Sequence, residues 1–269
     1  MKKAICICLV VSLLATLAGC APSDKEAAKQ DRDVLYQVSL LQGLTFGDYH
    51  GSITVGELKK HGDTGIGTFD KLNGELIMVD GVVYRAAGDG SIQVVPDDET
   101  IPFSNVTFMD ADETKALENV SDYKTLCDEL NALAEQRGKN HFHVIRIDGT
   151  FAMANVRSVN AQEEPYEPLV DVLEHDQTLF DYENVEGTIV GIYCPPYMSD
   201  LNAVGWHLHF LSKDKDKGGH VLGLRIADAV LTWDDTAGFQ MQLPKNDMFD
   251  GFDLTIDQTE DIEKAETNN

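Results

Sequence analysis

Three histidines stand close together in the C-terminal half of the sequence. The segment WHLHF at 206–210 alternates apolar residues with two of them. Residues i and i+2 of a β-strand point to the same side of the sheet, so His207 and His209 should share one face. The chain then passes through a polar turn and returns as GGHVL at 218–222, which contains His220. This pattern predicts a two-stranded ribbon that carries three imidazoles.

The register of this ribbon has two possible settings. A symmetric turn places His220 opposite Leu211, and a shift of two residues places it opposite His209. Because both settings keep the same side-chain parity, the three imidazoles lie on one face in either. Three convergent imidazoles leave coordination positions open, as a catalytic divalent metal requires. We expect zinc first, with iron, manganese and nickel compatible with the same ligands. Three unrelated surface histidines are the alternative interpretation.

A second pair, His141 and His143, has the same one-residue spacing at the start of another predicted strand. No third histidine lies within reach of a hairpin from this pair, and the nearby Arg137 and Arg146 disfavour a cation. We therefore interpret the pair as hydrogen-bonded or exposed histidines without a metal.

Glu75 and Arg157 are candidates for substrate chemistry. Glu75 shares a strand face with apolar residues, where a carboxylate is costly unless it is paired, metal-bound or protonated; a solvated strand end is the alternative. Arg157 closes a predicted strand and offers a planar fork for a carboxylate, although the pattern by itself favours a surface arginine. The acidic tail at 257–269 is, from its pattern alone, a solvated chain end.

The elements that must position these residues are mostly short strands. Alternating apolar residues and Asp-Gly or Gly-Asp-Gly turns predict a β-meander over 74–95. An apolar stripe predicts a helix from Ser121 to about Arg137, and a shorter helix is expected near 168–175. Further strands are predicted at 142–147, 150–159, 187–193, 204–212, 219–226 and 229–232. The pattern favours an α/β protein with mixed and antiparallel sheets and few helices.

Composition narrows the class of protein. The chain has 269 residues, of which 43% are hydrophobic and 25% are charged, so it can bury a sizeable core and is not a disordered chain. Lys and Arg number 21 against 46 Asp and Glu, which gives a net charge of -25. A surface of this sign repels phosphate backbones and anionic lipid headgroups. We therefore expect no nucleic-acid partner and no electrostatic binding to a membrane.

The N-terminus has the order of an export signal. Lys2 and Lys3 precede an apolar run at 4–18, and the segment LAGC at 17–20 resembles a bacterial lipobox. We predict a lipoprotein signal peptide at 1–19, a lipid on Cys20, and a polar tether at 20–34. The protein would then be exported and held at the cell envelope through that lipid alone. A plain cleaved signal or a short membrane anchor is the alternative.

The order of motifs along the chain resembles that of bacterial alpha-acetolactate decarboxylases. The resemblance extends from about residue 35 to the C-terminus. Its most distinctive parts are the HGDTGIGTF run and the HLHF segment followed by GGHVL. The matching segments include HGDTGIGTF at 61–69, GEL at 74–76, RSV at 157–159, HLHF at 207–210 and GGHVL at 218–222.

This resemblance implies roles for particular residues and a two-domain α/β fold. The implied fold has an N-terminal domain at 35–150, a metal-binding domain at 151–269, the metal in the cleft between them, and a homodimer as the assembly. The implied metal ligands are His207, His209 and His220. The implied catalytic residues are Glu75, Arg157 and a C-terminal glutamate, Glu266 or alternatively Glu263, with Thr68 as a further pocket residue.

The resemblance also implies an activity. Members of the family convert (S)-2-acetolactate, a small keto acid, to (R)-acetoin and CO2, with the metal acting as a Lewis acid on an enediolate. No thiamine or pyridoxal cofactor is then needed. Two other classes stay open from the sequence: a metal- or solute-binding surface lipoprotein without turnover, and another HxH metal enzyme such as a hydrolase or a cupin-like oxygenase.

Overall fold

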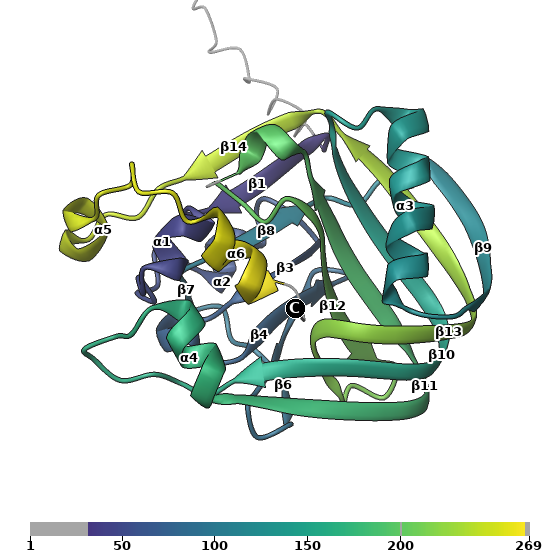
Figure 1. The fold of residues 1–269 in the computed structure, drawn as a ribbon, viewed down its shortest axis with the longest axis horizontal. Helices are drawn as coiled ribbons and strands as arrows, with labels where there is room; N and C mark the ends of the chain where they lie inside the picture. Colours follow the sequence, from purple (N-terminus) through teal and green to yellow (C-terminus); the bar gives the residue numbers. More distant parts are fainter. Residues whose placement is uncertain (1–31, 200, 267–269) are drawn as a thin grey trace, which may run out of the picture. The chain divides into compact units, whose positions relative to one another are not determined.

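A computed structural model of the chain describes residues 32–199 and 201–266, and Figure 1 shows its elements. A seven-stranded sheet has the order β14-β1-β8-β3-β4-β5-β6. Only β1 and β14 pair in parallel within it. Its strands are β14 (Gly238–Gln242), β1 (Val34–Val38), β8 (Ser104–Thr107), β3 (Thr64–Thr68), β4 (Glu75–Val79), β5 (Val82–Ala86) and β6 (Ile92–Val94).

A second, antiparallel sheet has the order β10-β11-β12-β13-β9, and β10 pairs with β13 as well. The additional pairing closes four of its strands into a ring. The strands are β10 (Phe142–Val159), β11 (Gln177–Cys194), β12 (Gly205–Ser212), β13 (Gly218–Thr236) and β9 (Glu113–Val120). A small sheet pairs β2 (Ile53–Thr54) with β7 (Thr100–Ile101).

The helices are short, with one exception. The long one, α3 (Tyr123–Arg137), packs apolar residues such as Leu126 and Leu130 into the core of the five-stranded sheet. The others are α1 (Leu41–Thr45), α2 (Val55–Leu58), α4 (Leu169–His175), α5 (Asp247–Gly251) and α6 (Thr259–Glu266), with 3-10 turns η1 (Asp70–Leu72) and η2 (Pro196–Met198). Apolar residues of α1, α4 and α6 form one cluster, which fastens the C-terminal helix to the rest of the fold.

The predicted meander, the two predicted helices and the mixed sheets are confirmed. Asp122, not Ser121, caps α3, because its side chain accepts a hydrogen bond from the amide of Thr125 at 2.7 Å. Asp80 and Gly81 both have positive φ, 52° and 75°, as the tight turn between β4 and β5 requires.

The expected break at Asp148-Gly149 was wrong. Residues 142–159 form one strand, β10, whose backbone pairs with β11 and β13 through this point. A Cβ at Gly149 would lie 2.4 Å from the Cα of Ala229, so the glycine permits close approach of the strands rather than a turn. The expected break near 227–228 was also wrong, because β13 continues through these residues.

The domain boundary expected after residue 150 falls inside strand β10. Strand β14, from the C-terminal half of the chain, pairs with β1 in the seven-stranded sheet. The predicted signal peptide, Cys20 and most of the predicted tether lie outside the described residues. Within the described ranges, no helix has the length and apolarity needed to cross a bilayer.

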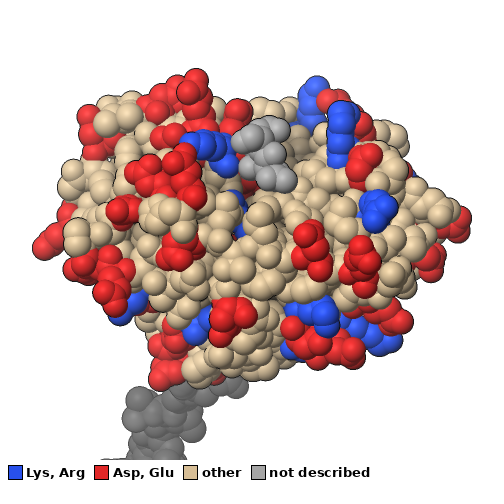
Figure 2. All heavy atoms as spheres, turned by 60° about the horizontal axis from the view of Figure 1, so that its bottom comes forward, with Lys and Arg blue, Asp and Glu red and all other residues tan. Residues whose placement is uncertain are grey.

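Acidic side chains are spread over the surface. Figure 2 shows one face of the molecule on which Asp and Glu recur around the outline, with smaller groups of Lys and Arg between them. This distribution agrees with the net charge of -25.

Candidate metal centre and active site

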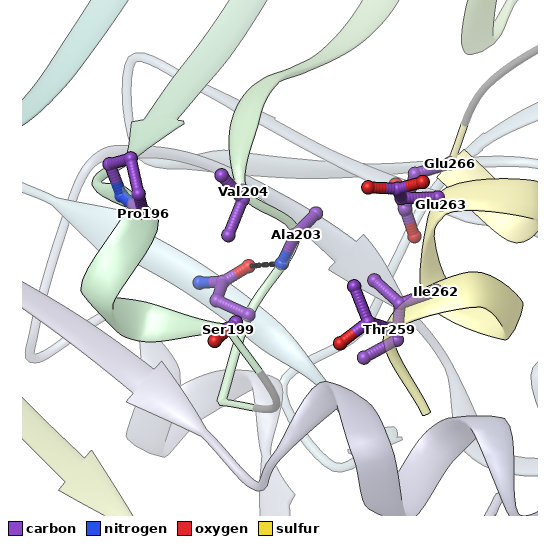
Figure 3. Close-up of a pocket in the computed structure, with 9 residues that line it drawn as sticks. Pro196, Ser199, Ala203, Val204, Thr259, Ile262, Glu263 and Glu266 are labelled. Carbon is purple, nitrogen blue, oxygen red and sulfur yellow. Dashed lines mark hydrogen bonds between the residues drawn. The ribbon is translucent and has the colours of Figure 1, made fainter. Parts of the chain in front are cut away.

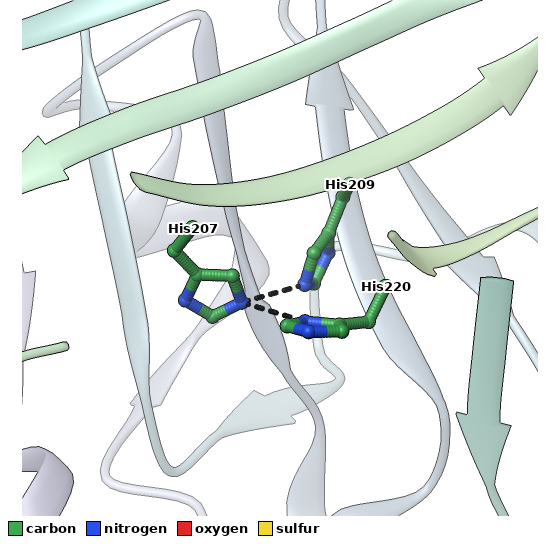
Figure 4. Close-up of side chains that lie close together, drawn as sticks. All are labelled: His207, His209 and His220. Atoms are coloured by element: carbon green, nitrogen blue, oxygen red, sulfur yellow. Dashed lines mark hydrogen bonds between the residues drawn. The ribbon is translucent and has the colours of Figure 1, made fainter. Parts of the chain in front are cut away.

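The three histidines of the ribbon converge in the interior. Nε2 of His207 lies 3.0 Å from Nε2 of His209 and 3.0 Å from Nδ1 of His220. All three side chains are buried, and Figure 4 shows the rings directed at a common point. Their ligand atoms lie within 4.8 Å of one another, and no other such group of three metal-ligating side chains occurs in the described part of the chain.

The register of β12 and β13 explains this convergence. His209 and His220 are direct cross-strand partners, which is the shifted register of the two that the sequence left open. Side chains of directly opposed residues lie on the same face of a sheet. His207 precedes His209 by two residues on the same strand, so its side chain lies on that face as well. Gly219 makes the approach of β13 to β10 possible, because a Cβ there would lie 2.5 Å from the carbonyl oxygen of Arg157.

The protonation of the trio suits metal binding. Nδ1 of His209 donates to the carbonyl oxygen of Leu76 at 2.9 Å in the tautomer that leaves Nε2 with a free lone pair. Burial lowers the pKa of His207 to about 3, with the charge of Arg157 adding to the effect. Burial also holds the pKa of His209 and of His220 well below the ordinary value. The imidazoles are therefore neutral at pH 7, the form that binds a metal.

A divalent metal fits this arrangement. Two nitrogens 3.0 Å apart can both bond to one ion at the zinc–nitrogen distance of about 2.0–2.1 Å. The converging atoms are Nε2 of His207, Nε2 of His209 and Nδ1 of His220, and each can present a lone pair in its neutral ring. Three neutral, desolvated imidazoles so close together gain a favourable partner if a cation lies between them.

Two carboxylates flank the histidines. Oε2 of Glu75, at the start of β4, lies 3.6 Å from Nε2 of His209. Oε2 of Glu266, at the end of α6, lies 3.1 Å from Nδ1 of His207, without the geometry of a hydrogen bond. Burial raises the pKa of each glutamate to about 7, and the charge of Arg157 opposes that rise. Of the two C-terminal candidates, the structure therefore brings Glu266, and not Glu263, to the histidines.

Arg157 joins the same group from β10. It is the cross-strand partner of His220 and is buried, with 7% of its surface exposed. One Nη donates to the carbonyl oxygen of Ala265 at 2.5 Å, while Nε has no partner in the protein. The guanidinium therefore holds the end of α6 and keeps donor capacity for a ligand.

These side chains line a small cavity of about 40 Å³. Its polar lining consists of Thr68, which is the cross-strand partner of Glu75, and of five of the candidate residues, namely Glu75, Arg157, His207, His220 and Glu266. The rest of the lining is mainly apolar and consists of Leu41, Leu44, Gly67, Leu72, Phe103, Val159, Leu169 and Leu173.

A larger cavity of about 280 Å³ is also lined by Glu266. Glu266 is the one residue that lines both. Figure 3 shows Glu263 and Glu266 on α6 across this cavity from Pro196 and Val204. We place the chemistry in the smaller cavity, because it contains His207, His220 and Arg157.

Two contributions to the site come from backbone atoms, the carbonyl oxygens of Leu76 and Ala265. A sequence pattern gives no signal for them, because any residue type offers the same carbonyl. The second histidine pair lies elsewhere: His143 is buried against Tyr193 and Trp233, with Nδ1 2.9 Å from Asp235. His141 is exposed. Neither belongs to the group formed by His207, His209 and His220.

Comparison with known proteins adds independent information. The family model described as alpha-acetolactate decarboxylase matches residues 35–256. The alpha-acetolactate decarboxylase of Methanosarcina mazei is 42% identical over 236 residues, which are 87% of this chain and 80% of the relative. That of Bacillus subtilis strain 168 is 37% identical over 233 residues, 86% of this chain and 90% of the relative.

Solved structures agree with the sequence comparison. The crystal structure of alpha-acetolactate decarboxylase from Bacillus subtilis strain 168 superposes with a TM-score of 0.84 at 36% identity, covering 87% of this chain and 100% of that one. A Staphylococcus aureus protein of unknown function, similar to alpha-acetolactate decarboxylase, has a TM-score of 0.82 at 31% identity over the same shares. The chain belongs to the alpha-acetolactate decarboxylase family.

Proposed function

We propose that the protein is a metal-dependent decarboxylase that converts (S)-2-acetolactate to (R)-acetoin and CO2. The observation that carries the proposal is a buried group of three neutral imidazoles, two of which line a small cavity together with two carboxylates and one arginine. Family membership supports the same substrate. We propose further that the site lies in the cleft between the two large sheets, since Glu75 comes from one and the histidines from the other.

His207, His209 and His220 would hold the metal, with zinc as the first candidate. When bound, a divalent metal supplies a Lewis acid that stabilises the negative charge developing on substrate oxygen as CO2 leaves. The coordination positions not taken by the histidines would be open to the substrate.

The side chains around the metal site have separate tasks. Arg157 binds and orients the substrate carboxylate through its fork, because its Nε has no partner in the protein. The bond from carbon to the carboxylate breaks, and a proton takes its place on that carbon. Glu75 and Glu266 are the groups placed to hold this proton, since both lie beside the imidazoles in a buried setting. The apolar lining limits the access of water.

One assay tests the function. The purified protein is incubated with racemic 2-acetolactate, and acetoin is measured with and without prior chelation of metal. We expect acetoin from the untreated protein, little after chelation, and recovery when zinc or another divalent metal is added back. The added metal that restores the highest rate identifies the preferred one. Metal binding without acetoin formation would instead indicate a binding protein, and a requirement for iron and oxygen would indicate an oxygenase.

We also propose that the protein is exported, that Cys20 is lipidated, and that the enzyme is a homodimer. The lipobox-like segment at 17–20 supports the first two, and family resemblance supports the third. Labelling with an alkyne fatty acid should modify the wild type and not Cys20→Ser, while Cys127→Ser serves as the matched control. Light scattering coupled to size exclusion on residues 21–269 measures the oligomeric state, and a mass of one chain would refute the dimer.

A further inference from the structure

An unusual backbone turn borders the small cavity. Lys71 and Leu72, in η1 between β3 and β4, both have left-handed backbone conformations, with φ of 63° and 57°. A Cβ in this conformation comes close to the following carbonyl oxygen, so a bulky residue adopts it rarely. Such strain persists where the surroundings enforce it, and it concentrates at functional sites.

Two other segments and one local hydrogen bond hold this turn in place. The amide of Lys71 donates to the carbonyl oxygen of Tyr49 at 2.8 Å, and the amide of Gln162 donates to the carbonyl oxygen of Lys71 at 2.7 Å. The amide of Gly74 donates to the carbonyl oxygen of Leu72 at 2.9 Å. The turn therefore has little freedom to relax.

The strained turn directs one side chain inward. Leu72 is 4% exposed and lines the cavity, whereas Lys71 is exposed to solvent. Leu72 lies in the chain between Thr68 and Glu75, two residues of the polar lining. Among the non-glycine residues that line the cavity, Leu72 alone has a positive φ. Leu72 is therefore a strained residue, and among the apolar side chains that line the cavity it is the one nearest in sequence to Glu75, the candidate catalytic glutamate.

We propose that Leu72 is a specificity-determining residue that limits the size of the alkyl groups on the keto acid. This inference rests on the proposed function. The carboxylate, hydroxyl and ketone of a 2-hydroxy-3-keto acid have partners in the polar lining, so its alkyl groups must lie against the apolar lining. A closed apolar pocket discriminates between substrates that differ by one methylene by about 10–200-fold in kcat/KM. A rigidly held side chain gives a larger part of this discrimination than one that can move aside.

The test compares substrates that differ by one methylene. Two larger substrates are used: one has an ethyl group in place of the methyl at C2, and the other has an ethyl group in place of the methyl of the ketone. For each of them, the ratio of its kcat/KM to that of 2-acetolactate is measured. In Leu72→Gly and in Leu72→Ala, we expect this ratio to rise at least about tenfold for one of the two larger substrates. Glycine tolerates positive φ without strain, so Leu72→Gly should fold even if the alanine variant does not.

Two matched variants serve as controls. Leu58→Ala removes the same atoms from a buried leucine in a different apolar cluster, and its ratio should stay within about twofold of wild type. A ratio within twofold of wild type in Leu72→Gly, with 2-acetolactate still decarboxylated, would overturn the inference alone. An equal rise in Leu169→Ala would also overturn it, by assigning the size limit to the whole lining. A wild-type protein that forms no acetoin would overturn the proposed function itself.

Discussion

Arg157 and His220 are direct cross-strand partners on β10 and β13, and His220 in turn opposes His209 on β12. One row across three strands therefore carries the arginine and two of the histidines on the same face. Sheet register, and not loop conformation, sets their relative positions. Sites built on paired strands hold their side chains more accurately than sites built on loops.

Replacing His209 by alanine should remove the metal. Losing even an indirect partner of a metal ligand weakens metal affinity by about 10–100-fold, so the loss of a direct ligand should cost at least about 100-fold. Elemental analysis and the acetoin assay measure the two effects, and circular dichroism checks the fold. His175→Ala, an exposed residue on α4, should keep both metal and activity. Full metal content in His209→Ala would remove this residue from the ligand set.

Replacing Arg157 by lysine should lower kcat by about 10²–10³-fold with metal content unchanged. The lysine keeps the charge but cannot both bind a carboxylate as a fork and hold the carbonyl oxygen of Ala265. Arg225→Lys, at an exposed position on β13, is the control and should leave kcat within about twofold. Unchanged kinetics in Arg157→Lys would show that the guanidinium does not act on the substrate.

Glu266 and Glu263 can be separated by the same substitution. Glu266→Gln should reduce kcat by about 10²–10⁴-fold, because its carboxylate lies beside His207 in the buried site. Glu263→Gln changes a residue of the larger cavity and should leave kcat within about twofold. Steady-state kinetics under saturating metal measures both. The reverse ranking would move the catalytic assignment to Glu263.

Asp234 should make stability depend on pH. It is 2% exposed, its Oδ2 accepts from the amide of Asp110 at 2.9 Å, and burial raises its pKa to about 7 from 3.8. Between these values the folded state holds a proton that the unfolded state has lost, so this group lowers stability as pH rises through the interval.

Asp234→Asn removes the loss of stability that accompanies rising pH, because asparagine does not titrate. Its side-chain oxygen can still accept the hydrogen bond from the backbone amide of Asp110. Its Tm should exceed that of wild type at pH 8 by at least about 2–4 °C, the shift that 1 kcal/mol gives in a domain of this size. The difference should shrink at pH 4.5, where Asp234 is protonated in the folded wild type. Asp228→Asn, exposed on the same strand, should show no such trend. A Tm difference that does not grow with pH would contradict the assignment.

Much of the site could be predicted because it depends on side-chain parity. Parity places His207, His209 and His220 on one face whichever register forms. For Glu75 the apolar neighbours left a buried carboxylate and a solvated strand end open, and only the folded structure shows that it is buried. The register itself depends on the turn at 213–217, whose sequence suits several turn lengths. Only the folded pairing shows that His220 opposes His209.

Other features could not be predicted, for physical reasons. An Asp-Gly pair is compatible with two different structures. At Asp80-Gly81 it forms a tight turn, and at Asp148-Gly149 it lies inside a strand where neighbouring strands approach closely. The distinction depends on which strands lie alongside, which is tertiary information. The burial of α6 likewise follows from long-range packing of Ile262 and Ala265 against α1 and α4, although its sequence is that of a solvated acidic segment.

The acidic surface affects the association of the substrate and the release of the products differently. A keto acid arrives as an anion and meets a repulsive field, whereas acetoin and CO2 leave without charge. Dissolved salt shortens the reach of that field to about 10 Å at 0.1 M ionic strength. The rate of association with the substrate should therefore be lowest at low ionic strength, while the rate of product release should not depend on ionic strength.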